Sequence, residues 1–123
     1  MSPDRYEPPR QEWREFFELV TKDHAGDAVT VEIVGREYGD QLEAEQMPFA
    51  YLEYDDKDDA VIVGVGGTDG RYPVVLRRIV EHPKVILVDP LDPRTACAFD
   101  IVGADGTSTI VTLHRRPALP PPD

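Results

Sequence analysis

The chain has 123 residues, a single cysteine and a hydrophobic fraction of 41%. This length and composition fit one domain with a real hydrophobic core, and the single cysteine excludes an internal disulfide. The formal net charge of −11 disfavours nucleic-acid binding and adhesion to anionic membranes, because both need clustered Lys and Arg. The N-terminal residues lack the apolar segment of a signal peptide, and no apolar stretch is long enough to span a bilayer, so we expect a cytoplasmic protein.

The first predicted element is an amphipathic helix that begins at Pro9 or Arg10 and ends at Gly26, where a glycine is a natural stop. Residues 1–9 contain three prolines and are expected to form a disordered tail. The apolar stripe of the helix recurs at i, i+3, i+4 and i+7 and consists of Trp13, Phe16, Phe17 and Val20. Because three aromatic side chains lie on this stripe, we expect the helix to cover a sheet.

After Gly26 the hydrophobic period changes from 3.6 residues to 2, which predicts β-strands. The predicted strand segments are 28–34, 40–46, 49–54, 60–65, 74–80, 84–88, 96–102 and 107–114. Short turns between them, and the hairpin signal Asp105-Gly106, favour antiparallel pairing.

These elements predict an α+β fold, mainly antiparallel β, with one N-terminal helix packed on a curved sheet, roll or partly open barrel of about eight strands. A single globular domain is expected over residues 10–115. Residues 116–123 are rich in proline and are expected to be a disordered tail.

Several short motifs occur in an order that resembles a known family of small bacterial proteins. The motifs lie at residues 12–17, 29–32, 41–44, 47–49, 79–83 and 104–107. Their order is similar to that of DUF5335, a largely actinobacterial family defined only as a domain of unknown function, and the similarity covers residues 10–114. The chain departs from the family pattern at Asp40 and Cys97. The resemblance implies a cytoplasmic domain of one helix followed by strands, and it implies no catalytic residues.

Two segments have only a superficial likeness to ligand-binding loops. Residues 64–70 are rich in glycine, but no helix N-terminus follows them to bind a phosphate, so we expect a hairpin loop. Residues 55–59 hold four aspartates, but Lys57 lies in the middle and the turn glycine of a calcium loop is absent, so we expect a solvated turn. No histidine has another His or a Cys at ligand spacing, and we therefore expect no metal site and no cofactor.

Cys97 shares one predicted strand face with Phe99 and Ile101, which favours an inert thiol in the core. The spacing leaves open a pair of a histidine with a cysteine or an aspartate, because such pairs assemble in space from distant segments. No pattern identifies a nucleophile, an acid or a base. The sequence therefore predicts no catalytic residue, and we lean toward a protein that is not an enzyme.

Arg77 and Arg78 point to opposite faces of a predicted strand whose faces are otherwise apolar, so one of them must lie beside hydrophobic side chains. One interpretation is that this arginine pairs with Glu32, Glu43 or Glu45 on a nearby strand. The other interpretation is a binding site for an anion or a partner. That site would be formed by Arg77, Arg78, His82, Lys84, Arg115 and Arg116.

The charges are distributed unevenly along the chain. Residues 1–60 hold 17 acidic and 6 basic side chains, whereas residues 61–123 hold 7 of each kind. If the acidic and basic strands are neighbours in space, their charges neutralise each other. If they are not, opposite ends of the sheet are complementary and self-association is expected.

Three functional hypotheses follow. The first is a non-enzymatic cytoplasmic module that binds a protein partner or self-associates, with no nucleic acid and no membrane among its partners. The second is a protein that binds a small ligand or an anion, or an enzyme, with a pocket near Arg78 and His82. The third is an acidic mimic of nucleic acid, which requires the acidic side chains to form one continuous face.

Overall fold

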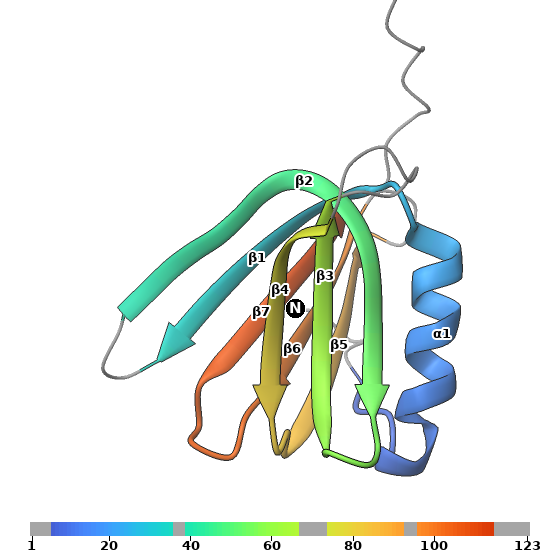
Figure 1. Ribbon diagram of the computed structural model, residues 1–123, viewed down its shortest axis with the longest axis vertical. Coiled ribbons are helices and arrows are strands. Elements are labelled where there is room, and N and C mark those ends of the chain that lie inside the picture. The colour runs from blue at the N-terminus through green and yellow to red at the C-terminus, as the bar shows by residue number, and fades with distance from the viewer. Residues whose placement is uncertain (1–5, 36–38, 67–73, 93–95, 115–123) are drawn as a thin grey trace, which may run out of the picture.

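The computed structural model describes residues 6–35, 39–66, 74–92 and 96–114 (Figure 1). A short 3₁₀ turn, Arg10–Glu12, leads directly into the helix α1 (Trp13–His24). The strands are β1 (Ala28–Gly35), β2 (Gly39–Asp55), β3 (Ala60–Gly66), β4 (Val74–Glu81), β5 (Val85–Asp92), β6 (Ala96–Val102) and β7 (Ser108–His114). Within the described residues, no helix has both the length and the apolar character needed to cross a membrane.

All of these strands form one antiparallel sheet in the order β4-β3-β2-β1-β7-β6-β5. The predicted α+β fold with one N-terminal helix and a curved antiparallel sheet is confirmed. The expected segments 40–46 and 49–54 are two parts of the single strand β2, which runs through Met47 and Pro48. The described part of the chain therefore contains seven strands where about eight were expected.

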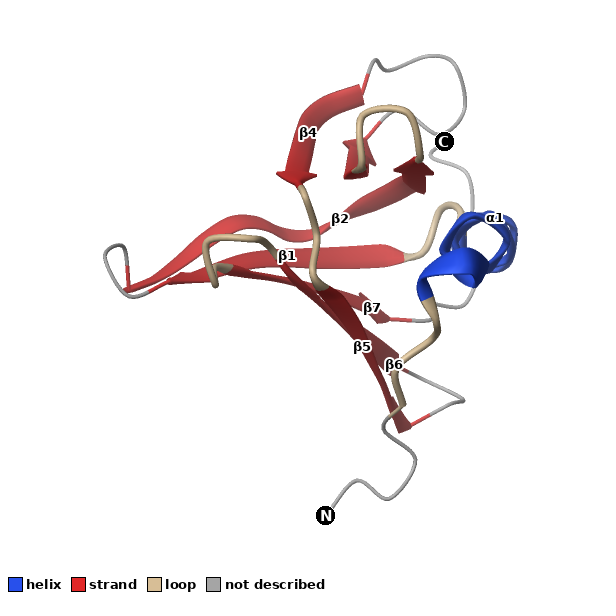
Figure 2. Cartoon of the chain, turned by 90° about the horizontal axis from the view of Figure 1, so that it is seen from below, coloured by secondary structure: helices blue, strands red, loops and turns tan. Residues whose placement is uncertain are grey.

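The bend in β2 folds the sheet into two layers, as the end-on view in Figure 2 shows. The first part of β2 pairs with β1, and its second part pairs with β3. The register between β1 and β2 shifts twice, between Val29 and Val31 and again between Val31 and Glu32. Each shift marks one extra residue on β2, and an extra residue of this kind increases the local bend and twist of a strand. One layer thus contains β3, β4 and the end of β2, and the other contains β1, β7, β6 and β5.

Helix α1 covers one open side between the two layers (Figure 1). The predicted apolar stripe faces the sheet, and Trp13, Phe17 and Val20 are buried while Phe16 packs against the core. Phe16 lies 5.9 Å from Phe99 of β6, measured between ring centroids. The helix therefore joins both layers, and its aromatic side chains close this side of the core.

The chain before the helix follows the sheet from Tyr6 onward, although we expected a disordered tail over residues 1–9. Tyr6 and Val88 of β5 exchange two backbone hydrogen bonds, of 3.0 and 2.8 Å. The Trp13 indole donates a hydrogen bond of 3.0 Å to the carbonyl of Pro8. Residues 1–5 of the expected tail, and the expected tail over 116–123, lie outside the described residues.

Gly64 provides a direct test of packing on the outer face of β3. A Cβ atom at this position would overlap the ring of Tyr51 from the neighbouring strand β2. We expect Gly64→Ala to lower the free energy of unfolding by about 1–3 kcal/mol, because the ring must move. Urea denaturation measures this value. In a Tyr51→Ser background the added methyl group should cost much less, and an equal cost in both backgrounds would show that the ring is not the cause.

Candidate functional site

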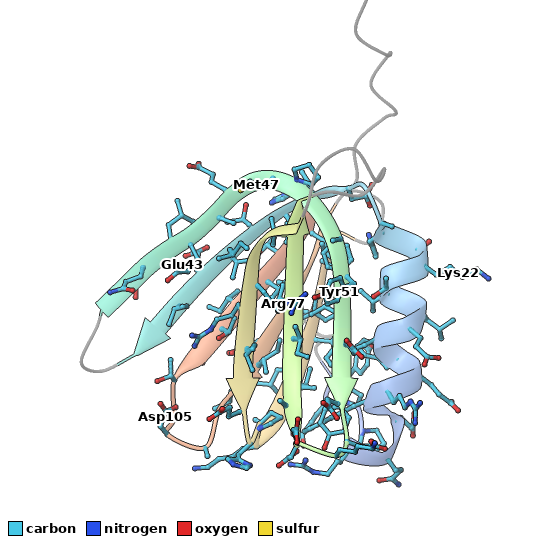
Figure 3. The ribbon with its side chains drawn as sticks, viewed as in Figure 1. Lys22, Glu43, Met47, Tyr51, Arg77 and Asp105 are labelled. Carbon is cyan, nitrogen blue, oxygen red and sulfur yellow. The ribbon has the colours of Figure 1, made fainter. Side chains whose placement is uncertain are left out.

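Arg78 extends from β4 into the space between the two layers. It lies opposite the fully buried Val63 in the register with β3, so the two side chains share the inner face. Its Nε donates a hydrogen bond of 3.3 Å to the hydroxyl of Thr109, a fully buried residue of β7 in the other layer. Arg77 is exposed on the outer face (Figure 3). The prediction that the two arginines point to opposite faces is confirmed.

A hollow of about 380 Å³ opens beside Arg78, between the end of β4 and the turn that joins β6 to β7. Arg78, Glu81 and His82 line it on one side, and Asp105 and Thr107 line it on the other. The two residues that the sequence placed near a pocket, Arg78 and His82, thus border one hollow. Its walls combine apolar surface from the strands with charged groups of both signs.

The other described residues of the predicted set lie elsewhere. Arg77 and Lys84 do not line the hollow, and the backbone N–H of Lys84 pairs with the carbonyl of Val102 at 2.7 Å. Arg115 and Arg116 lie outside the described residues. The structure therefore brings together Arg78 and His82 from the predicted set, and it separates Arg77 and Lys84 from them.

Arg78 influences the pKa of Asp105, a carboxylate in the β6–β7 turn. Among the described ion pairs, none joins Arg78 to Glu32, Glu43 or Glu45. The pKa of Asp105 is lowered mainly by the hydrogen bond from the backbone N–H of Thr107, and the positive charge of Arg78 lowers it further. These contacts therefore do not support the interpretation in which a glutamate of a neighbouring strand neutralises Arg78.

The acidic side chains of this chain lie on separated elements. Glu15 and Glu18 are on the exposed side of α1, whereas Glu43 and Glu45 are on the arm formed by β1 and the first part of β2 (Figures 1 and 3). These two elements lie on opposite sides of the molecule. This arrangement does not favour a continuous acidic face, and we do not propose a mimic of nucleic acid.

His82 also belongs to a polar network at the start of the helix. Asp59 accepts hydrogen bonds of 2.7 Å from the Tyr54 hydroxyl and 2.8 Å from Arg10, and its other carboxylate oxygen lies 3.5 Å from Nδ1 of His82. Arg10 further donates a 2.6 Å hydrogen bond to the carbonyl of Pro83 and lies 4.4 Å from the centre of the Trp13 ring. The network links the helix start to the β2–β3 and β4–β5 turns.

Two residues of the network have a backbone conformation that is unfavourable for L-amino acids. Asp59 and His82 both have φ of 49°, and the N–H of His82 donates a 2.8 Å hydrogen bond to the carbonyl of Asp59. Such residues cost free energy and persist where surrounding contacts hold them. The network therefore fixes His82 at the rim of the hollow.

The side chains of the network shift one another's pKa values. The hydrogen bond from Tyr54 lowers the pKa of Asp59, and the hydrogen bond and charge of Arg10 lower it further. Burial raises the pKa of Tyr54, and its hydrogen bond to Asp59 raises it more. No local pattern in the sequence indicates these contacts, because Arg10 and Asp59 are 49 residues apart.

We expect Asp59→Asn to reduce the free energy of unfolding by about 1 kcal/mol near pH 7, a value limited by the partial exposure of the carboxylate. Because the folded state lowers the pKa of Asp59, its contribution is present above the ordinary aspartate pKa of about 4 and is lost as the pH falls further. Urea denaturation from pH 3 to 7 with Asp58→Asn as the control measures this difference. Equal effects of both variants at every pH would contradict the network.

Within the described ranges, no group of three or more His, Cys, Asp or Glu side chains could hold a metal ion.

Comparison with known proteins identifies the family of this chain. The family model of DUF5335, a family of unknown function, matches residues 6–122. An uncharacterized protein of Aquifex aeolicus (strain VF5) is 30% identical over 115 residues, which cover 94% of this chain and 95% of that protein. No solved structure matches. The chain therefore belongs to the DUF5335 family of unknown function, as the order of its motifs predicted.

Proposed function

We propose that this protein is a non-enzymatic, cytoplasmic interaction domain that binds an extended acidic segment of a partner protein along β4. The observation that carries the proposal is the hollow beside Arg78 and His82, which adjoins a strand at the end of the sheet. An extended peptide adds to such an edge through backbone hydrogen bonds, and neighbouring pockets select its side chains.

The backbone of β4 favours strand addition. Among the described strands it pairs only with β3, and its register is regular from Leu76 to Glu81. Ile79 is 48% exposed on this segment. The opposite end of the sheet, β5, already pairs with the backbone of Tyr6. The part of β2 that pairs with β1 contains two register irregularities and also carries acidic residues and Pro48. These features discourage pairing at its other edge.

The charges of the hollow favour a carboxylate. Arg78 can donate several hydrogen bonds in a planar fork that matches a carboxylate, and His82 adds a second donor or cation. Glu81 and Asp105 on the rim disfavour a ligand with many negative charges, such as nucleic acid or an anionic membrane surface. A peptide with a single carboxylate at the hollow meets both conditions.

Self-association is a second candidate, because among the ion pairs of the described residues none joins an acidic strand residue to a basic one. Glu43 lies on the β1–β2 arm, away from Arg77 of β4 (Figure 3). Glu45 and Arg78 belong to the same two strands. A second copy can therefore supply an acidic segment to β4. The bulges in the arm make this partner less suitable than a regular strand.

Binding of a defined peptide tests the proposal. A blocked, fluorescent eight-residue peptide of valine and threonine with one central glutamate should bind at least about tenfold more tightly than the same peptide with glutamine at that position, because charge-assisted hydrogen bonds contribute about 1.5–3 kcal/mol. Fluorescence anisotropy at low salt measures both affinities. Arg78→Gln should abolish the preference for glutamate.

Arg77→Gln is the matched control, because it removes the same charge from the adjacent residue on the outer face. Equal losses in the two arginine variants, or no binding of either peptide, would contradict the proposal. Urea denaturation establishes that each variant is folded, and His82→Gln serves as a second test if Arg78→Gln is not. Sedimentation of the wild-type protein shows whether it forms an oligomer. If it does, and if Arg78→Gln dissociates that oligomer, the strand bound at β4 belongs to a second copy of this chain.

A further inference from the structure

A second cluster of reactive groups lies at the other end of α1 and is independent of β4. His24 is the last residue of the helix, Asp27 lies just before β1, and Cys97 is the second residue of β6. Nδ1 of His24 lies 2.9 Å from a carboxylate oxygen of Asp27, and Nε2 lies 3.9 Å from the sulfur of Cys97. The imidazole of His24 thus lies between the thiol of Cys97 and the carboxylate of Asp27.

The local backbone holds the histidine in place. Gly26 adopts φ of 90° after the helix, a conformation that glycine favours, and the N–H of Asp27 donates to the carbonyl of His24 at 2.9 Å. Phe49 of β2 exchanges two backbone hydrogen bonds with this turn, of 2.9 Å with Gly26 and 2.8 Å with Asp27. The side chains of His24 and Asp27 are only 10% and 18% exposed, so the surroundings restrict their movement.

This geometry fits an activated thiol. If Nδ1 carries its proton toward Asp27, Nε2 is free to accept the proton of the Cys97 thiol, and Asp27 then stabilises the imidazolium. Asp23 adds a second carboxylate, with an oxygen 3.5 Å from Nε2. A thiolate is the reactive form of cysteine, and a neighbouring imidazolium favours it.

The remaining charged and titratable groups around the cluster are few among the described residues. Tyr6 from the N-terminal segment is near enough that the charge of a Cys97 thiolate contributes to the raised pKa of the Tyr6 hydroxyl, after the larger effect of burial. Lys22 lies two residues before His24 in the last turn of α1 and lines the adjacent hollow. The charge of a Cys97 thiolate thus disfavours ionisation of Tyr6, and Lys22 adds a positive charge at this end of the helix.

A small molecule has room to approach this end of the helix. A hollow of about 570 Å³ adjoins His24 and is lined by Phe16, Leu19, Lys22 and Asp23, among others. Cys97 forms no disulfide and is half-buried, with its side chain packed against the core. It therefore lies on the core face, as the sequence predicted, yet at a position where it also contacts a buried histidine.

We propose that Cys97 is an activated thiol that forms a mixed disulfide with a small disulfide molecule, with His24 as the base and Asp27 as the positioning residue. His24 takes the thiol proton, and the thiolate attacks one sulfur of the small disulfide. A new S–S bond forms to Cys97 as the original S–S bond breaks. The departing thiolate takes the proton from His24, so the products are the protein mixed disulfide and one small thiol.

Reaction with dithiodipyridine tests the proposal without any variant. The release of its coloured thiol is followed from pH 5 to 9 for the native protein and for the same protein unfolded in urea. Below pH 7 the native rate should exceed the unfolded rate by about fivefold or more, because the base keeps the thiol reactive. Mass spectrometry should find one adduct on Cys97 that a reductant removes.

Two variants separate the roles of the neighbours. His24→Gln should reduce the native rate below pH 7 to that of the unfolded protein, and Asp27→Asn should shift the fall in rate to higher pH. Lys22→Gln is the control on the same helix end and should retain the wild-type pH profile. A native rate below the unfolded rate at every pH is the result for an inert core thiol and would overturn the proposal, whether or not the variants fold.

Discussion

The aromatic side of α1 is the contact on which the rest of the structure depends. A sheet that bends into two layers must bury both inner faces, and two sides between the layers remain open. Trp13 and Phe17 fill one of these sides, and each is almost fully buried. One helix can close only one side. The other side lies at β4, where the polar contact between Arg78 and Thr109 joins the layers.

The two ends of α1 bring together residues that are distant in the sequence. At its start, Arg10 donates hydrogen bonds to Asp59 and to the carbonyl of Pro83. At its end, His24 lies between Asp27 and Cys97. Helix ends leave backbone groups without partners, and the neighbouring turns contribute polar side chains there. The hydrophobic packing of the helix thus determines where the reactive and charged groups of this protein meet.

Local patterns predicted the elements well because periodicity reports which face is buried. The stripe on α1 and the opposite directions of Arg77 and Arg78 both follow from spacing alone. The continuity of β2 was missed because Pro48 usually interrupts a strand, whereas here it lies at an outer edge beside two bulges. The contact between His24 and Cys97 joins residues 73 apart and depends on where the helix ends against β6. No local pattern contains that information.

Helix α1 closes one side of this sheet, and at the other side the outer edge of β4 pairs with no described strand. Hydrogen exchange of the free protein measures this directly, residue by residue. If the edge is uncovered, alternate amides of β4 exchange rapidly while those of β3, which is paired on both sides, are protected. Uniform protection along β4 would contradict it, because the edge would then already be covered.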